Sequence, residues 1–188
     1  MPTRIHHSPL EVICGPMFAG KTTELLRRIE HAREAGERVR VVKPTLDTRY
    51  AAHELVTHTN VRVAAIGISH VNEFAQHAQD FDTIAIDELH FFGGEATAAI
   101  ERLRANGQRV IVAGCDIDHF GEPFAPFDVL IPLATEVLRL SGSCARCGAP
   151  STHSERLVAN SSRIIVGGIG DFEATCARCF RPMARDAQ

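Results

Sequence analysis

A glycine-rich stretch near the start of the chain has the residue types of a phosphate-binding loop. Gly15 and Gly20 have four residues between them and are followed by Lys21 and Thr22, which is the phosphate-loop spacing. Glycines let backbone N–H groups curl around phosphate oxygens, lysine adds positive charge at the β- and γ-phosphates, and a threonine hydroxyl can bind Mg²⁺. The apolar run before the loop and the helix-period segment after it favour a nucleoside triphosphate site over a plain glycine turn. The predicted site comprises Gly15, Pro16, Met17, Phe18, Ala19, Gly20, Lys21 and Thr22.

Two adjacent carboxylates, Asp87 and Glu88, follow the apolar run 81–86. Phosphate-loop proteins place at the end of such a strand the carboxylate that holds Mg²⁺, usually through water. A second carboxylate beside it commonly acts as a general base on a water or a hydroxyl. The alternative is a solvated acidic turn, which the phosphate loop elsewhere in the chain makes less favourable.

Two cysteine pairs carry the spacing of a metal site. Cys144 and Cys147 form the first pair, Cys176 and Cys179 form the second, and 28 residues lie between the pairs. Four thiolates around one tetrahedral Zn²⁺ make a closed structural site without an open position for catalysis. A redox pair or unligated thiols are the alternatives. A bound zinc ion would fix both ends of the segment 148–175, which has little core of its own.

Other polar residues give weaker signals. Asp47 and Arg49 place a carboxylate and a guanidinium two residues apart after a predicted strand. Arginine could neutralise a transferring phosphate and aspartate could orient a hydroxyl, although a surface ion pair is an equal interpretation. Gly167 and Gly168 allow close approach of the backbone to a ligand, or simply form a turn.

The composition limits the class of protein. The chain has 188 residues, 45% of them hydrophobic, with 20 basic and 23 acidic residues and a net charge of −3, which is unlike a nucleic-acid-binding face. No apolar stretch approaches the ~20 residues of a membrane span, and the first residues lack the apolar core of a signal peptide. We therefore expect a cytoplasmic protein in which Cys14 and Cys115 are buried hydrophobic residues.

Strand-like and helix-like segments alternate along the chain. Strands are predicted at 10–14, 38–42, 61–66, 81–86 and 109–113, and helices from the phosphate loop to Gly36, at 69–79 and at 94–105. This order predicts a mainly parallel sheet with helices on both faces. The polar clusters follow predicted strands, so we expect them to converge at the carboxyl edge of the sheet.

The composition changes near residue 141, where Gly and Cys become frequent and helical periodicity ends. The only strand-like run there is 163–166. We therefore divide the chain into a phosphate-loop core, residues 1–140, and a small zinc-binding unit, residues 141–188.

Taken together, these motifs resemble the cellular-type (type II) thymidine kinases from about Leu10 to Phe180. GPMFAGKTTEL, DTRY, IDELHFF, GEPF, VGG and both CxxC pairs occur in the order and spacing of that family. The resemblance implies a RecA-like phosphate-loop core with a C-terminal zinc unit, ATP and thymidine as substrates, Mg²⁺ as cofactor, and a homotetramer. It also implies that a loop, roughly 154–173, closes over the base.

The resemblance also assigns roles to individual residues. Lys21, Arg49 and Glu88 would be catalytic, with Glu88 taking the proton from the nucleoside 5′-hydroxyl, and Asp87 would serve Mg²⁺. The residues implied for nucleoside binding are Met17, Asp47, Phe91, Cys115, His119, Ser154, Arg156, Val166, Gly167 and Phe172.

Several pocket positions depart from the family pattern. His90 stands for a usual Gln, Ser154 for Thr and Phe172 for Tyr, and the stretch 115–120 differs at three positions, including His119 for an aromatic ring. An imidazole can stack and also hydrogen-bond, and its ordinary pKa predicts that it can become charged near neutral pH; otherwise Phe120 supplies the ring. A kinase for another nucleoside, and an ATPase whose zinc unit binds a partner, are the alternative functions.

Overall fold

Six parallel strands form the central sheet of the computed structural model, which describes residues 8–47, 54–56, 62–159 and 162–183. The strand order is β5-β2-β6-β7-β1-β8, and every neighbouring pair is parallel. These strands are β1 (Leu10–Cys14), β2 (Val39–Pro44), β5 (Ile66–Ile68), β6 (Thr83–Ile86), β7 (Arg109–Gly114) and β8 (Glu136–Arg139). The predicted parallel sheet is confirmed.

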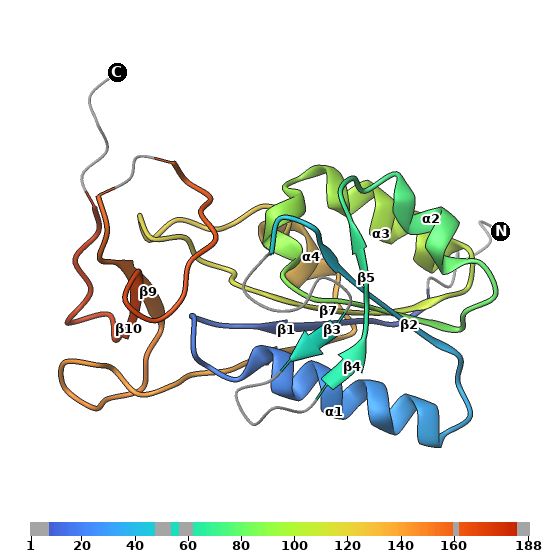
Figure 1. The fold of residues 1–188 in the computed structure, drawn as a ribbon, viewed down its shortest axis with the longest axis horizontal. Coiled ribbons are helices and arrows are strands. Elements are labelled where there is room, and N and C mark those ends of the chain that lie inside the picture. The colour runs from blue at the N-terminus through green and yellow to red at the C-terminus, as the bar shows by residue number, and fades with distance from the viewer. Residues whose placement is uncertain (1–7, 48–53, 57–61, 160–161, 184–188) are drawn as a thin grey trace, which may run out of the picture.

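Helices cover both faces of this sheet (Figure 1). Helix α1 (Lys21–Glu34) lies on one face, and α2 (Glu73–Ala78), α3 (Glu95–Ala105) and α4 (Phe127–Leu133) lie on the other. Alternate residues of a strand point to opposite faces. Val12 accordingly packs with Ile100 and Phe127, whereas Ile13 packs with Leu25 of α1. Because both faces are covered, the central strands are apolar almost throughout.

Helix α1 has the predicted pattern. Its apolar residues Leu25, Leu26, Ile29 and Ala32 are buried, and they recur at the spacing that places them on one face. The helix ends just before Gly36, which has a left-handed conformation with a φ of 87°. Full burial of each large apolar side chain stabilises the fold by roughly 1.5–3 kcal/mol.

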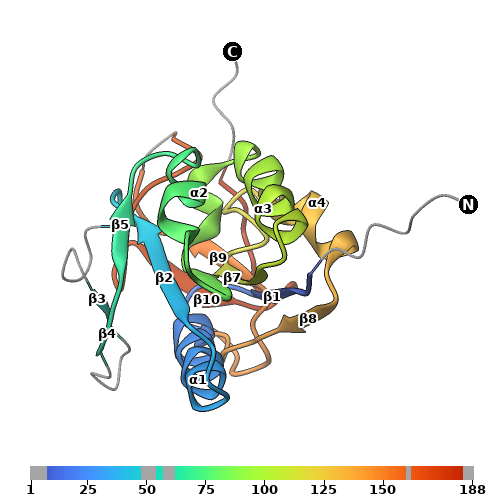
Figure 2. The ribbon, with the colours of Figure 1, turned by 90° about the vertical axis from the view of Figure 1, so that its right-hand side faces the viewer.

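Three predicted elements differ from the structure. The predicted strand 61–66 is two strands, because the chain leaves the hairpin partner β3 (Glu54–Val56) after β4 (Arg62–Ala64) and joins the main sheet as β5. Figure 2 shows the β3–β4 hairpin beside the β5 edge. The predicted helix 69–79 is shorter, since the N–H groups of Ser69 and His70 donate to Glu73 in a turn before α2.

The predicted strand 163–166 is wrong. This segment has no strand pairing, and the carbonyl oxygens of Ser162 and Arg163 accept hydrogen bonds from the Arg156 guanidinium instead. The strands of the C-terminal region are β9 (His153–Arg156) and β10 (Phe172–Thr175), which pair in antiparallel register. In Figure 1 this hairpin lies beyond the carboxyl ends of β1 and β7.

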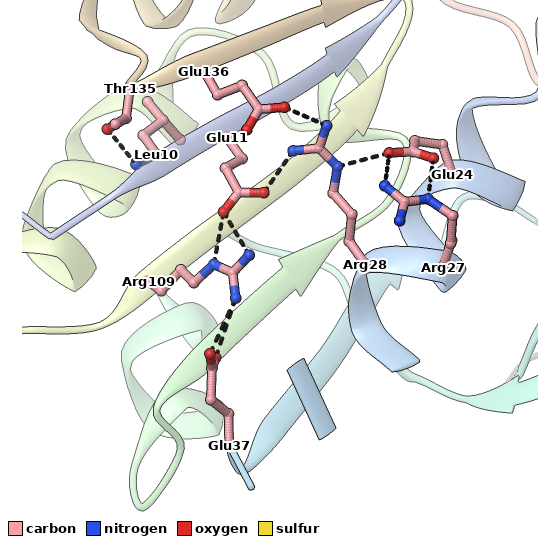
Figure 3. A network of polar contacts seen from close by, with 9 residues as sticks. All are labelled: Leu10, Glu11, Glu24, Arg27, Arg28, Glu37, Arg109, Thr135 and Glu136. Atoms are coloured by element: carbon pink, nitrogen blue, oxygen red, sulfur yellow. Dashed lines mark hydrogen bonds and ion pairs between the residues drawn. The ribbon is translucent and has the colours of Figure 1, made fainter. Parts of the chain in front are cut away.

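A network of charged residues joins β1, β7, β8 and α1 near the amino end of the sheet (Figure 3). The Glu11 carboxylate accepts hydrogen bonds from Arg28 at 2.5 Å and from Arg109 at 2.7 Å. Arg28 also donates to Glu24 at 2.9 Å and to Glu136 at 2.6 Å. Burial alone would raise the pKa of Glu11, but the hydrogen bonds from Arg109 and Arg28 outweigh it and hold this pKa below its ordinary value.

Replacing Glu11 by Gln should destabilise the protein, because Arg28 and Arg109 would lose their shared, buried counter-charge. We expect the free energy of unfolding, measured by urea denaturation at neutral pH, to fall by about 3–5 kcal/mol. The control Asp82→Asn removes a carboxylate that is 48% exposed and pairs with Arg38, and its loss of stability should be much smaller, because water screens an exposed pair. Equal losses in the two variants would contradict the importance of the buried network.

Candidate functional site

The predicted phosphate loop lies between β1 and α1, where its glycines are required by the backbone. Gly15 has φ 141°, and a Cβ atom there would lie 2.3 Å from the Leu140 carbonyl oxygen. Gly20 has φ 83°, a left-handed conformation, directly before the first residue of α1. The loop therefore directs the amino end of α1 toward the carboxyl edge of the sheet, where an anion would meet free N–H groups.

Lys21 and Thr22 connect the loop to its surroundings. The buried ammonium group of Lys21 donates to the Pro16 carbonyl oxygen at 2.6 Å, so it is folded across the loop. The Thr22 hydroxyl donates to the Asp87 carboxylate at 2.9 Å. Thr22 lies in the first turn of α1, after β1, and Asp87 follows β6, so the predicted convergence of the phosphate loop and the acidic pair is confirmed.

Asp87 is buried, and its environment disfavours a lone negative charge. Burial first, and then the neighbouring carboxylate of Glu88, raise the pKa of Asp87 to about 7. A nearby cation would reverse this shift, since an opposite charge favours the ionised form. A hydroxyl and a carboxylate oxygen at hydrogen-bond distance are ligands that suit Mg²⁺. The donor set therefore fits the cation that accompanies a nucleotide.

Glu88 directly precedes the short 3₁₀ helix η1 (Leu89–Phe92) and has a left-handed conformation with φ 50°. Its N–H donates to Asp87 at 3.0 Å, and one of its carboxylate oxygens lies 3.5 Å from His90 Nδ1. The same nitrogen of His90 accepts the Cys115 backbone N–H at 3.3 Å. His90 therefore spans the ends of β6 and β7 beside Glu88.

One cavity of about 430 Å³ brings most of the predicted site residues together. It is lined by the phosphate-loop side of α1, the ends of β2, β6 and β7, and the C-terminal hairpin. The predicted residues on its wall are Met17, Phe18, Gly20, Lys21, Thr22, Asp47, Asp87, Glu88, Phe91, Cys115, His119, Ser154, Gly167 and Phe172. Its size is typical of a small-molecule site.

Other predicted residues are not on the cavity wall. Gly15, Pro16 and Ala19 shape the phosphate loop, and Val166 is not among the lining residues. Arg49 lies outside the described residues, so the structure does not place it.

Arg156 supports the cavity from behind its wall. Its guanidinium donates to the Ser162 carbonyl oxygen at 2.6 Å and lies 5.6 Å from the centre of the Phe172 ring. Arg156 therefore holds the segment that begins at Ser162 in position and does not itself line the cavity.

Some lining residues were not predicted from the sequence. Lys43, at the end of β2, is 1% exposed and donates to the Glu54 carbonyl oxygen at 3.1 Å. A lysine at the end of an apolar strand was the sequence feature that could have indicated this site residue. The others include Ile117, Asp118, Phe124, Arg163, Ile164, Ile165 and Ile169.

His119 corrects the expectation of a charged imidazole. The residue is 3% exposed, its ring centre lies 3.9 Å from that of Phe120, and its Nε2 has no hydrogen-bond partner among the described residues. Burial first, and then the positive charge of Arg156, lower the pKa of His119 to about 4. The ring is therefore neutral between pH 6 and 8, and the expected titration near neutrality is wrong. The alternative in which His119 points to solvent is also excluded by its burial.

The four paired cysteines form one cluster. The sulfur atoms of Cys144, Cys147, Cys176 and Cys179 all lie within 4.8 Å of one another, and those of Cys147 and Cys176 are 3.6 Å apart. A tetrahedral zinc ion with bonds of about 2.3 Å holds its sulfur ligands about 3.8 Å apart. All four thiols are free of disulfides. The cluster could therefore hold a metal ion such as zinc.

The described residues contain no helix that is both long and apolar enough to cross a membrane.

The fold and the site together define a phosphate-loop α/β protein with a four-cysteine unit. The family model described as "Thymidine kinase" matches residues 8–180. The chain belongs to the thymidine kinase family, as its motifs predicted.

Known members of the family are similar over nearly the whole chain. The thymidine kinase of Chloroflexus aurantiacus is 40% identical, covering 92% of this chain and 94% of that protein. The thymidine kinase of Rhodothermus sp. is 38% identical, covering 92% and 81%. That of Roseiflexus sp. is 40% identical, covering 96% and 98%. This level of similarity places the chain among the kinases, which are transferases.

The metal site predicts a specific effect of Cys147→Ser. Cys147 is exposed, so the change should not disturb packing. We expect about one zinc ion per chain in the parent protein by elemental analysis, and a clear loss of zinc in the variant with faster hydrogen exchange of 162–175. The control Cys14→Ala changes a buried thiol outside the cluster and should keep the metal. Metal-free parent protein with reduced thiols would contradict a structural zinc site.

His119→Phe should stabilise the protein by about 1–3 kcal/mol, because it removes a buried ring nitrogen that has no hydrogen-bond partner among the described residues. The unfolded state binds a proton on His119 near pH 6.5, whereas the folded state resists this until about pH 4. The parent therefore loses stability as the pH falls from about 6.5 to 4. Unfolding curves at several pH values should show the advantage of the variant growing across that window. A constant or reversed difference would contradict a neutral, unpartnered ring.

Proposed function

We propose that this protein transfers the γ-phosphoryl group of ATP to the 5′-hydroxyl of thymidine or deoxyuridine, giving a nucleoside monophosphate. The observation that carries the proposal is the pairing of Thr22 with Asp87, beside Glu88, at one end of a cavity that extends to the β9–β10 hairpin. Family membership supports the acceptor.

The phosphate end of the cavity would bind ATP. The loop N–H groups and the amino end of α1 would surround the phosphates, and Lys21 would exchange its contact with Pro16 for one with phosphate oxygens. Thr22 and Asp87 would hold Mg²⁺. When bound with ATP, Mg²⁺ neutralises charge that develops on the transferring group.

Glu88 would act as the general base. Its carboxylate removes the 5′-hydroxyl proton as the hydroxyl oxygen bonds to the γ-phosphorus, and ADP leaves with the electron pair of the broken bond. Its position next to Asp87 and on the cavity wall supports this role. Arg49, outside the described residues, would neutralise charge on the phosphoryl group.

The nucleoside would occupy the rest of the cavity. Met17, Asp47, Phe91 and Cys115 would contact it from the core side, and Ser154, Gly167 and Phe172 from the hairpin side, with Arg156 and Val166 supporting them. His119 would contribute a neutral ring.

A second candidate is a kinase of the same build with another base preference. The observation that favours it is that His90, Cys115 and His119, which depart from the family pattern, all lie on the cavity wall. A panel of nucleosides in an assay of nucleoside-dependent ADP release separates the two candidates. ADP release without any nucleoside would instead indicate an ATPase with a partner-binding zinc unit.

We also infer, from the family alone, that the chain works in nucleotide salvage in the cytoplasm as a homotetramer.

Lys21→Ala should abolish phosphoryl transfer, because the phosphates lose their main side-chain counter-charge. The measurement is ADP release at saturating thymidine over a range of ATP concentrations. Turnover near that of the parent would remove Lys21 from the ATP site.

Glu88→Gln should keep the binding of both substrates but lower kcat by roughly 10²–10⁴, the range for loss of a general base. The control Glu30→Gln changes an exposed carboxylate on α1 and should leave kcat unchanged. A kcat within a few fold of the parent in Glu88→Gln would mean that another group accepts the proton.

A further inference from the structure

Two segments from different parts of the chain form much of the cavity wall. The segment 115–124 follows β7 and contributes Cys115, Ile117, Asp118, His119 and Phe124. The segment 162–171 directly precedes β10 and contributes Arg163, Ile164, Ile165, Gly167, Gly168 and Ile169. The contacts between these two segments therefore decide the width of the cavity.

Arg163 makes three contacts across this boundary. Its Nε donates to Asp118 Oδ2 at 2.6 Å, its Nη2 donates to the Pro123 carbonyl oxygen at 2.8 Å, and its guanidinium carbon lies 5.3 Å from the centre of the Phe124 ring. A guanidinium can donate several hydrogen bonds in its plane while its face packs on a ring, whereas a lysine ammonium has no planar face.

The two partners of this ion pair differ in their freedom to move. The Asp118 side chain is 0% exposed, and its Oδ1 accepts the N–H groups of Phe120 and Glu122, each at 2.9 Å. These bonds lie within one loop and fix the carboxylate whether or not Arg163 is present. The Arg163 side chain is 45% exposed, so it can move into water without leaving a cavity in the core.

The other hydrogen bonds assigned between the 162–171 segment and described residues stay within the C-terminal region. Gly168 N–H donates to Asp171 at 3.0 Å, and the Leu157 N–H donates to the Asp171 carbonyl oxygen at 2.8 Å. Arg156 of β9 binds the carbonyl oxygens at the start of the segment. Among the hydrogen bonds assigned between described residues, those of Arg163 are the ones that join this segment to the core.

We propose that Arg163 and Asp118 form a latch that closes the 162–171 segment over the bound nucleoside. Arg163 is then a positioning residue, which sets the affinity for the nucleoside and leaves the chemical step to other groups. This inference rests on the proposed function, since it concerns the acceptor half of the same cavity.

The latch predicts that a change at Arg163 alters the KM for thymidine but not the KM for ATP. Arg163→Gln keeps much of the side chain but loses the charge and the ring contact. We expect it to raise KM for thymidine by about 10-fold, the lower end for a charged hydrogen bond because Arg163 is half exposed. KM for ATP should be unchanged and kcat should not fall. Arg163→Lys, which keeps the charge, should restore only part of the affinity.

Salt supplies a second readout, because an ion pair with one half-exposed partner is partly screened and thymidine itself is uncharged. KM for thymidine should rise with ionic strength in the parent and stay level in Arg163→Gln. The matched control Arg38→Gln breaks an exposed ion pair with Asp82 that is not on the cavity wall. This variant should keep the parent's KM for thymidine and its dependence on ionic strength.

Hydrogen exchange of the protein without substrates tests the latch independently of activity. Amides of 163–171 should exchange faster in Arg163→Gln than in the parent, with the phosphate loop unchanged. Unaltered exchange and an unaltered KM for thymidine would overturn the latch, as would a variant that loses ATP affinity to the same extent. If exchange of 163–171 is faster in Arg163→Gln than in the parent, but the parent does not phosphorylate thymidine, the proposed function is refuted and the latch is not.

Discussion

The hydrogen bond between Thr22 and Asp87 joins the ends of two strands that are not neighbours in the sheet. Thr22 follows β1 and Asp87 follows β6, while β7 lies between these strands. The bond can form because all three strands are parallel, so that their carboxyl ends meet on one edge. Each remaining part of the site is arranged around this pair.

The strand between them must end in a residue without a side chain. A Cβ on Gly114, the last residue of β7, would lie 2.9 Å from the Phe127 ring and 3.0 Å from His90 Nδ1. Gly114 thus lets α4 pack beneath the site and lets His90 reach the Cys115 N–H. The small residue in the middle allows the groups on either side to approach.

Sequence patterns located the chemistry of the site well, because that chemistry imposes strict local spacing. The phosphate loop meets the acidic pair through Thr22 and Asp87, and the two cysteine pairs form one cluster, as predicted. The strands β1, β6 and β7 were also predicted, since they are buried on both faces and read as apolar runs.

The missed elements have weak patterns for identifiable reasons. Strand β8 is a mostly exposed edge strand, α4 has only seven residues and contains Pro132, and β9 reads His-Ser-Glu-Arg. The polar residues of β9 are buried through long-range partners: Arg146, from the first cysteine knuckle, pairs with Glu155 and with Glu173 of β10. A run such as 163–166 has strand-like residues without a neighbouring strand to pair with, and pairing is a property of the whole fold.

The position of the C-terminal hairpin depends on the phosphate loop as well as on the cysteines. The Met17 N–H donates to the Ser154 hydroxyl at 2.8 Å, so β9 is attached to the loop directly. Leu140 N–H donates to the Cys14 carbonyl oxygen at 2.8 Å, which attaches the chain entering the hairpin to the end of β1. A change in the conformation of the loop would therefore move the wall that carries Ser154. The Met17–Ser154 hydrogen bond therefore links the loop to the hairpin wall of the cavity, and a metal ion held by the four cysteines would make that hairpin more rigid.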